Sequence, residues 1–310
     1  MDKIGTKIWH NGALVPWASA KVHVLAHGLH YGSAVFEGIR CYDGVAGSQF
    51  LHLRAHLQRL ADSARIYRMP LPYDVVALVD ACHAVMADSG LSAGYLRPIA
   101  YRGLGTLGLM PHDSPVEVAI GVLGWGAYLG EEAAAAGIDV GVASWARMAA
   151  NTVPTQAKAS GNYLSSQLIA MEAHRNGYHE AIALDTHGFV SEGPGENIFL
   201  VRAGCLTTPP ATAAILPGLT RAAIIQLARA CGLEVREEAI AREALHLADE
   251  LFFTGTAAEV TPIRSVDRLQ VGDGRPGPIT RALQASFQDI VHGRAVDTWN
   301  WLEPLRPTVD

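Results

Sequence analysis

Lysine is scarce in this chain of 310 residues, and one lysine stands in a segment suited to chemistry. Of the 24 basic residues only four are lysines, and the only one after Lys21 is Lys158. Arginine keeps its proton in proteins, so it can serve neither as a nucleophilic amine nor as a proton shuttle. Lys158 lies among small residues directly before a predicted helix, where low polarity favours the neutral amine that a nucleophile requires. A single lysine is more often an ordinary surface residue, but here Tyr163 follows closely enough to share a site.

Two further segments have the features of an anion site. The segment 216–221 (LPGLTR) enters an amphipathic helix, so the N–H groups of Leu219 and Thr220 would face outward at the positive end of the helix dipole. The segment 254–258 (TGTAA) ends a buried strand with small residues and a glycine that permits close backbone approach. Each segment alone is more often a helix cap or a turn. Together with a reactive lysine, they favour a site for pyridoxal 5′-phosphate (PLP), an aldehyde that carries a phosphate.

A PLP site also needs a carboxylate that keeps the pyridine nitrogen of the cofactor protonated. The segment 191–197 (SEGPGEN) offers Glu192 and Glu196 on a glycine-rich turn between two predicted strands. Acidic residues in a turn are usually solvated, so this segment is a weak indication by itself.

Two other patterns suggest different chemistry and are rejected. The segment 103–108 (GLGTLG) matches a dinucleotide-binding fingerprint, but Pro111 and Pro115 follow it and exclude the helix that would hold a pyrophosphate. This segment is predicted to be a flexible loop. His52 and His56 have the spacing of two metal ligands on one helix face, but no third ligand lies nearby in sequence. They are therefore interpreted as polar residues on the helix surface, and no metal is expected.

The composition is that of a globular protein. The formal net charge is −6, with 49% hydrophobic and 17% charged residues, and no basic tract suggests a nucleic-acid partner. The longest uncharged stretch, 203–220, contains three prolines and cannot span a membrane. No apolar signal core begins the chain, and four scattered cysteines predict neither disulfides nor a zinc site. We expect a cytoplasmic protein without a membrane partner.

Hydrophobic spacing and turn residues predict short strands and separate helices, and therefore the α+β class. A hairpin is expected over 9–15 and another over 180–190, with a turn at 185–188. The other predicted strands are 94–102, 116–123, 138–144, 197–201 and 251–254. The predicted helices are 54–67, 73–89, 163–175, 220–230 and 281–292.

Taken in order, these motifs resemble those of the class IV, or fold-type IV, PLP aminotransferases. The resemblance rests on Arg54, Lys158 and the segments EGPGEN (192–197), LPGLTR (216–221) and TGTAAE (254–259). The segments HGLHYGSAVFEGIRCYD (27–43) and YLRP (95–98) narrow it to the branched-chain amino acid aminotransferases. This family implies a fold like that of D-amino acid aminotransferase, with PLP at the interface of two domains. We expect a smaller N-terminal α/β domain (1–125), an interdomain loop (126–137) and a larger PLP-binding C-terminal domain (138–310).

The resemblance implies a role for each matching residue. Lys158 would be the catalytic residue, forming an aldimine with PLP and moving a proton between the substrate α-carbon and the cofactor. Glu192 would pair with the pyridine nitrogen, and Tyr163 would lie near the phenolic oxygen. Arg54 would help to hold the phosphate, although its spacing alone predicts a surface residue. The expected cofactor-binding residues are Arg54, Lys158, Tyr163, Glu192, Asn197, Leu216, Gly218, Leu219, Thr220, Gly255 and Thr256.

The same resemblance implies reversible, ping-pong transamination of leucine, isoleucine and valine with 2-oxoglutarate, which yields branched 2-oxo acids and glutamate. An apolar pocket would take the branched side chain, and Arg97 would bind the distal carboxylate of glutamate. The residues expected to bind substrate are Tyr31, Phe36, Gly38, Tyr95, Arg97, Leu109, Trp125, Tyr128, Tyr163, Thr256 and Ala257. Tyr31 and Leu109 would reach the neighbouring subunit's site, which implies a homodimer or a larger assembly such as a hexamer.

Other functions are compatible with parts of this pattern. A D-amino acid aminotransferase, an aminodeoxychorismate lyase or an (R)-selective amine transaminase would share the fold. The segment 36–40 (FEGIR), with Tyr95 and Arg97, favours the L-branched-chain substrates. A non-catalytic PLP carrier would be expected to lack Lys158, and a histidine-based metal enzyme is the remaining alternative.

Overall fold

The computed structural model describes residues 5–124 and 131–306, which form two compact units. Unit 1 comprises Met1–Trp125, Ala157–Gly161 and Asp289–Asp310, and unit 2 comprises Gly126–Gln156 and Asn162–Gln288. This division differs from the predicted domains, because the short segment that contains Lys158 and the C-terminal segment both belong to unit 1. The expected interdomain loop lies partly outside the described residues, and its remainder contains a helix, α4 (Glu131–Ala136).

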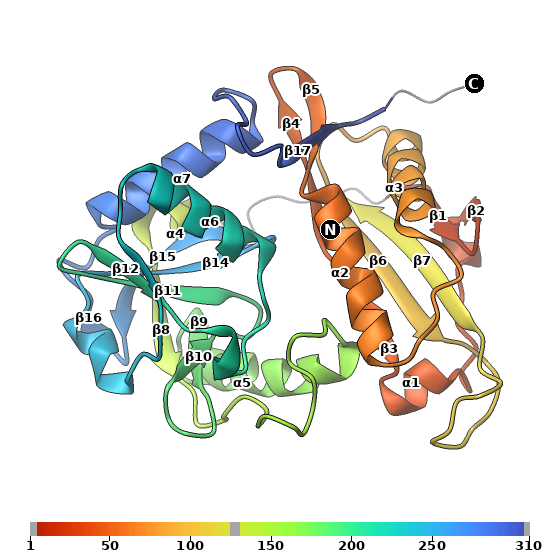
Figure 1. The fold of residues 1–310 in the computed structure, drawn as a ribbon, viewed down its shortest axis with the longest axis horizontal. Helices are drawn as coiled ribbons and strands as arrows, with labels where there is room; N and C mark the ends of the chain where they lie inside the picture. Colours follow the sequence, from red (N-terminus) through yellow and green to blue (C-terminus); the bar gives the residue numbers. More distant parts are fainter. Residues whose placement is uncertain (1–4, 125–130, 307–310) are drawn as a thin grey trace. The chain divides into compact units, whose positions relative to one another are not determined.

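Unit 1 is built on an antiparallel sheet covered on one face by two helices, α2 (Leu53–Ile66) and α3 (Val75–Ser89) (Figure 1). Within the described residues the sheet has eight strands, in the order β17-β5-β4-β6-β7-β1-β2 with β3 beside β6. The strands are β1 (Lys7–His10), β2 (Ala13–Pro16), β3 (Ala34–Phe36), β4 (Ile39–Gly44), β5 (Gly47–Leu51), β6 (Gly94–Arg102), β7 (Val116–Leu123) and β17 (Leu302–Pro304). The unit also contains η1 (Trp17–Ser19) and α1 (His27–Tyr31).

The sequence explains how these two helices are placed. Leu57, Leu60 and Ala64 recur at helical spacing on α2 and are fully buried in the core of unit 1. The helix α3 begins after Asp74, whose carboxylate accepts a hydrogen bond from the N–H of Ala77 at 2.8 Å. It ends at Gly90, which has a φ of +65° and forms a left-handed cap that a glycine adopts without strain.

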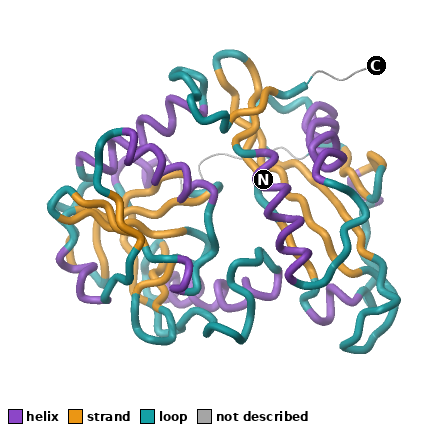
Figure 2. Tube along the Cα trace, in the orientation of Figure 1, coloured by secondary structure: helices purple, strands orange, loops and turns teal. Residues whose placement is uncertain are grey.

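Unit 2 is built on a second sheet, which has nine strands within the described residues. Eight of them follow the order β10-β9-β8-β15-β14-β11-β12-β13, and β16 pairs with β15. The strands are β8 (Ile138–Val142), β9 (Glu180–Leu184), β10 (Val190–Glu192), β11 (Asn197–Arg202), β12 (Cys205–Thr208), β13 (Val235–Glu237), β14 (Glu250–Gly255), β15 (Glu259–Val266) and β16 (Leu269–Gln270). The helices are α5 (Tyr163–Arg175), α6 (Leu219–Ala230) and α7 (Pro278–Val291), together with short 3-10 turns η3 (Ala211–Ala213) and η4 (Arg242–Leu247). The last three residues of α7 and the first two of the 3-10 turn η2 (Ser160–Asn162) belong to unit 1. Figure 2 shows how helices and strands alternate with long loops along the chain.

The structure confirms most of the predicted elements. Strands 94–102 and 116–123 and helix 163–175 have the predicted bounds, and the other predicted elements end within about three residues of the observed ones. The prediction missed α1, α4 and several strands, namely β3, β4, β5, β12, β13, β15, β16 and β17. Most of the missed strands are short or rich in glycine and polar residues, so they show little alternation.

Candidate active site

Both backbone groups of Lys158, its N–H and its carbonyl, form hydrogen bonds within unit 1. Its N–H donates to the Ser63 hydroxyl at 3.0 Å, and its carbonyl accepts from the N–H of Phe36 at 3.0 Å. The next residue, Ala159, forms an antiparallel bridge with Val35 and belongs to the buried core. The Lys158 Nζ atom lies 5.0 Å from the centroid of the Phe36 ring, and the residue is half-buried. The backbone is therefore fixed while the amine rests against an aromatic face.

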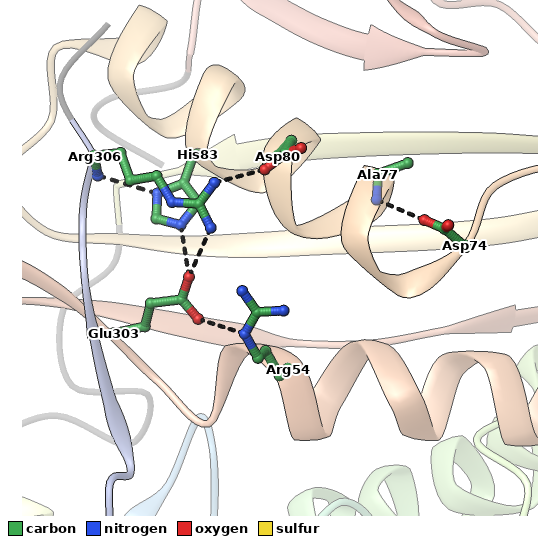
Figure 3. Close-up of polar contacts among 7 residues, drawn as sticks. All are labelled: Arg54, Asp74, Ala77, Asp80, His83, Glu303 and Arg306. Carbon is green, nitrogen blue, oxygen red and sulfur yellow. Dashed lines mark hydrogen bonds and ion pairs between the residues drawn. The ribbon is translucent and has the colours of Figure 1, made fainter.

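Arg54 lies elsewhere on unit 1. Its side chain is 55% exposed, and its Nε atom is 3.3 Å from the Glu303 carboxylate. Glu303 also accepts from His83 and Arg306, so this network joins the start of α2 to the C-terminal strand β17 (Figure 3). The contacts of Arg54 thus indicate a structural tie at the C-terminus, and they give no support to the predicted phosphate role.

A better placed cation, which the sequence analysis missed, is Arg59 on the face of α2 that carries His56 and Ser63. Residues three or four apart share one face of a helix, and Ser63 holds the backbone of Lys158. Arg59 is mostly buried and donates to both oxygens of the fully buried Glu37, at 2.6 and 2.8 Å. Its spacing from Ser63 was the signal available in the sequence.

The surface interpretation of the two histidines is wrong for His56, which is 1% exposed and bonded to Glu37 at 2.7 Å. Burial lowers the pKa of His56, so the ring is neutral and donates its Nδ1–H to the carboxylate. Burial raises the pKa of Glu37 by itself, but Arg59 and His56 outweigh it and hold the pKa well below its usual range. His52 is half-buried, and burial lowers its pKa to about 3. The surface interpretation fails for His56 because the face of α2 that carries His56, Arg59 and Ser63 is buried, as its apolar face is.

Four of the predicted substrate residues lie together on unit 1. The guanidinium carbon of Arg97 is 5.1 Å from the centroid of the Phe36 ring and 5.0 Å from that of Tyr95. A Cβ atom at Gly38 would overlap the Tyr95 hydroxyl, so glycine is required there. Lys158 contacts the same Phe36 ring as Arg97. Arg97 also borders a hollow of about 610 Å³ on the sheet face opposite α2 and α3.

Tyr31 and Leu109, which are expected to reach a neighbouring subunit, lie in two segments that are hydrogen-bonded to each other. Tyr31 at the end of α1 donates to the carbonyl of Leu107, and His27 contacts the carbonyl of Gly108 at 3.0 Å. Tyr31 is 45% exposed and Leu109 is 81% exposed. The connection from Gly103 to Pro115 contains no helix, as expected from its prolines.

Unit 2 holds the predicted carboxylate in a well-bonded setting. Glu192 is 5% exposed at the end of β10, although acidic residues in a turn are usually solvated. One of its oxygens is 2.6 Å from Arg147 Nη2. The other accepts from the Asn197 side chain at 2.9 Å and from the N–H of Leu216 at 3.0 Å. Asn197 also donates to the carbonyl of Leu216, so it links Glu192 to the segment that enters α6.

The segment before α6 has the form of an anion site. The helix begins at Leu219 after Gly218, and no side chain caps it. Its first N–H groups therefore lack intrahelical partners. A Cβ atom at Gly218 would overlap the Asn197 side-chain oxygen, so this close packing requires glycine. In the same unit, the hydroxyl of Thr254 is buried without a hydrogen-bond partner among the described residues. Uncapped N–H groups and an unpaired hydroxyl fit a bound phosphate.

Other predicted residues are less informative. Tyr163 is the first residue of α5 and is half-buried. Gly255 ends β14, Thr256 and Ala257 begin the turn that follows it, and all three are half-buried. Trp125 and Tyr128 lie outside the described residues. No helix in the described part of the chain is long and apolar enough to cross a membrane.

A model of the amino-transferase class IV family matches residues 34–266. The chain belongs to the class IV aminotransferases. The match contains Arg54, Lys158, Glu192, the α6 entry and the turn after β14, on which the predicted family resemblance was based.

Similar proteins narrow the family. The branched-chain-amino-acid aminotransferase of Salmonella typhimurium is 52% identical over 299 residues, which cover 96% of this chain and 97% of the relative. The crystal structure of the branched-chain amino acid aminotransferase of Escherichia coli superposes with a TM-score of 0.96 at 51% identity, covering 97% of this chain and 100% of that one. The branched-chain amino acid aminotransferase of Thermobaculum terrenum, in its PLP form, gives a TM-score of 0.91 at 36% identity, covering 98% and 99%.

These matches confirm the predicted family and fold class. The class IV aminotransferase has branched-chain amino acid aminotransferase activity, and its cofactor is PLP.

Proposed function

We propose that this aminotransferase transfers the amino group of leucine, isoleucine or valine reversibly to 2-oxoglutarate by a ping-pong mechanism. The observation that carries the proposal is the arrangement in unit 1, where Lys158 and Arg97 both contact the ring of Phe36. A reactive amine, an aromatic wall and a cation for a second carboxylate are thus combined. An apolar wall suits a branched side chain, while the arginine suits glutamate.

The chain's own residues divide the work. Bound PLP supplies the electron sink that makes the substrate α-carbon acidic. Lys158 Nζ would hold the cofactor and carry the proton released from that carbon. Glu192 would pair with the protonated pyridine nitrogen, and the N–H groups at Leu219 and Thr220 would bind the phosphate.

We also propose that Arg59 replaces Arg54 as the phosphate-binding arginine. Its support is the shared helix face with Ser63, which bonds the Lys158 backbone, whereas Arg54 is exposed beside Glu303 of the C-terminal strand. Arg59 is itself paired with Glu37, so its position on the helix face, and not the lack of a partner, carries the proposal. The remaining cofactor residues (Tyr163, Asn197, Leu216, Gly218, Gly255 and Thr256) keep their predicted roles.

For the substrate, Tyr95 and the backbone at Thr256 and Ala257 would receive the α-carboxylate. The predicted apolar wall comprises Phe36, Trp125, Tyr128 and Tyr163, with Gly38 leaving room beside Tyr95. Arg97 would bind the distal carboxylate of glutamate or 2-oxoglutarate.

The active assembly is proposed to be a homodimer or a larger homo-oligomer such as a hexamer, acting in the cytoplasm. Its support is the exposed apolar surface formed by α1 and the loop between β6 and β7, which includes Leu29, Tyr31, Leu107 and Leu109. Tyr31 and Leu109 would complete the site of the neighbouring subunit.

The test is the visible absorption spectrum of the purified protein before and after L-leucine is added without an oxo acid. We expect a yellow band that converts to the spectrum of pyridoxamine phosphate, and no such band in the variant Lys158→Ala. A band that responds only to a D-amino acid or an amine would retain the fold and overturn the substrate. No band after incubation with PLP would overturn the proposal.

A further inference from the structure

Arg147 is a buried cation that none of the predicted roles uses. It is 6% exposed, and its Nη2 atom lies 2.6 Å from a carboxylate oxygen of Glu192. Its other terminal nitrogen, Nη1, contacts the Ser166 hydroxyl of α5 at 3.3 Å, and its backbone N–H donates to the carbonyl of Leu184 at 2.8 Å. Arg147 is therefore anchored to the end of β9 and to α5 while it contacts the carboxylate at the end of β10.

The partners of Glu192 fix the direction in which its carboxylate points. Arg147 holds one oxygen, and Asn197 and the N–H of Leu216 hold the other. All three lie within unit 2 and contact the carboxylate from different segments, namely the chain after β8, the start of β11 and the entry to α6. Among these three partners Arg147 carries a charge, so it can affect the protonation of Glu192 by its charge as well as by its hydrogen bond.

Burial favours the protonated form of Glu192, and the charge of Arg147 opposes this effect. A buried carboxylate without a positive partner takes up a proton, because low polarity disfavours its charge. A protonated Glu192 could not stabilise a positive charge on a pyridine ring. Arginine stays charged at every accessible pH, so it keeps the carboxylate ionised without titrating itself.

We propose that Arg147 is a positioning residue that keeps Glu192 ionised and oriented, and so keeps the cofactor's pyridine nitrogen protonated. This inference rests on the proposed function, in which Glu192 pairs with that nitrogen. Arg147 acts through Glu192 and carries no direct contact to the substrate in this scheme.

The test uses the holoenzyme reconstituted with PLP that carries ¹⁵N in the ring. The ¹⁵N chemical shift reports directly whether the ring nitrogen is protonated, which a merely structural residue would not change. The variants are Arg147→Lys, which keeps the charge, and Arg147→Gln and Arg147→Met, which remove it. The control is Arg264→Met, which breaks another arginine–carboxylate pair of unit 2, with Asp139 at 2.6 and 3.0 Å.

We expect the neutral variants to move the ring nitrogen toward the unprotonated shift and to raise the PLP dissociation constant about tenfold or more. In these variants we expect a decrease in kcat that is larger, as a fold-change, than the change in KM for leucine. Arg147→Lys should keep the protonated shift, and Arg264→Met should behave as the wild type in all three measurements.

The inference would be overturned if the neutral variants had the same ¹⁵N chemical shift and the same PLP dissociation constant as the wild type. If Arg147→Met does not fold, the test rests on the comparison of Arg147→Lys with Arg147→Gln. Equal ¹⁵N chemical shifts in these two variants would also overturn the inference. A wild-type protein that binds no PLP would instead overturn the proposed function, so the two failures are distinguishable.

Discussion

At the scale of single residues, the chemistry depends on where a few cations find their partners. Arg54 and Arg59 belong to the same helix but face different surroundings, one at the C-terminal strand and one toward a buried carboxylate. Arg97 is placed over two aromatic rings, which leaves its charge available for a substrate.

The two arginines of α2 form a matched pair for mutation. A hydrogen-bonded charge pair with phosphate contributes about 1.5–3 kcal/mol, or roughly 10- to 150-fold in Kd. We expect that Arg59→Ala raises the PLP dissociation constant by this factor, while Arg54→Ala changes it less than about twofold. Titration of the apoproteins with PLP checks this, and circular dichroism verifies that Arg59→Ala, which leaves Glu37 without one partner, remains folded. A larger effect of Arg54→Ala would restore the original assignment.

Arg97 should separate the two half-reactions. Loss of its charge removes the partner of glutamate's second carboxylate, whereas leucine has no such group. We expect that Arg97→Ala lowers kcat/KM for glutamate roughly 10-fold or more and that for leucine less than about threefold. Single-turnover kinetics with each amino acid measures this directly. Equal losses for both amino acids would contradict the assigned role.

At the scale of elements, sequence patterns located the motifs but could not assign the partners of each side chain. The strands 94–102 and 116–123 are mostly apolar runs bounded by glycine or proline, and Gly177 follows the helix 163–175, so their bounds were predictable. Lys158 stood out because lysine is scarce. By contrast, the ion pairs Arg59–Glu37 and Arg147–Glu192 join residues 22 and 45 positions apart, and the spacing in one sequence provides no signal for such pairs. Glu37 in particular lies beside a short strand that the patterns missed.

One such long-range contact determines how α7 begins. Glu250 on β14 is buried and accepts from the N–H of Ile279 at 3.0 Å and from the N–H and hydroxyl of Thr280 at 2.7 and 2.6 Å. The carboxylate thus replaces the missing helical partners of the first turn.

We expect that Glu250→Gln lowers the free energy of unfolding by about 1–3 kcal/mol. The side-chain NH2 of glutamine is a donor, and it would lie against the N–H groups that now donate to the carboxylate. Urea unfolding followed by circular dichroism measures the change. The control Glu238→Gln removes the same charge at an exposed position and should change stability by less than about 0.5 kcal/mol. Equal effects would show that net charge, and not the contact at α7, is responsible.

At the scale of the whole molecule, the two units should respond to pH in opposite directions. In unit 1, burial lowers the pKa of His52 to about 3 and lowers that of His56 and His83. Below pH 6.5 the unfolded chain takes up protons at these rings that the folded unit excludes, so acid favours unfolding. In unit 2, burial and the neighbouring charge of Glu196 raise the pKa of Glu180 to about 8. An unfolded Glu180 is ionised above pH 4.5 while the folded one keeps its proton, so rising pH favours unfolding until about pH 8.

Hydrogen exchange followed by mass spectrometry resolves the two units in the full PLP-loaded chain. After correction for intrinsic exchange rates, we expect peptides of α2 to lose opening free energy as the pH falls from about 6.5 to about 5.5. Peptides of β9 and β11 should lose it as the pH rises from about 6 to about 8, by at most about 1.4 kcal/mol per pH unit for each group. The variant Glu180→Gln keeps the side-chain shape but has no proton to lose, so it should abolish the trend in unit 2 and leave that in unit 1 unchanged. Because Glu180 is the only group changed, an unaltered trend in β9 and β11 would show that its carboxyl is ionised in the folded unit.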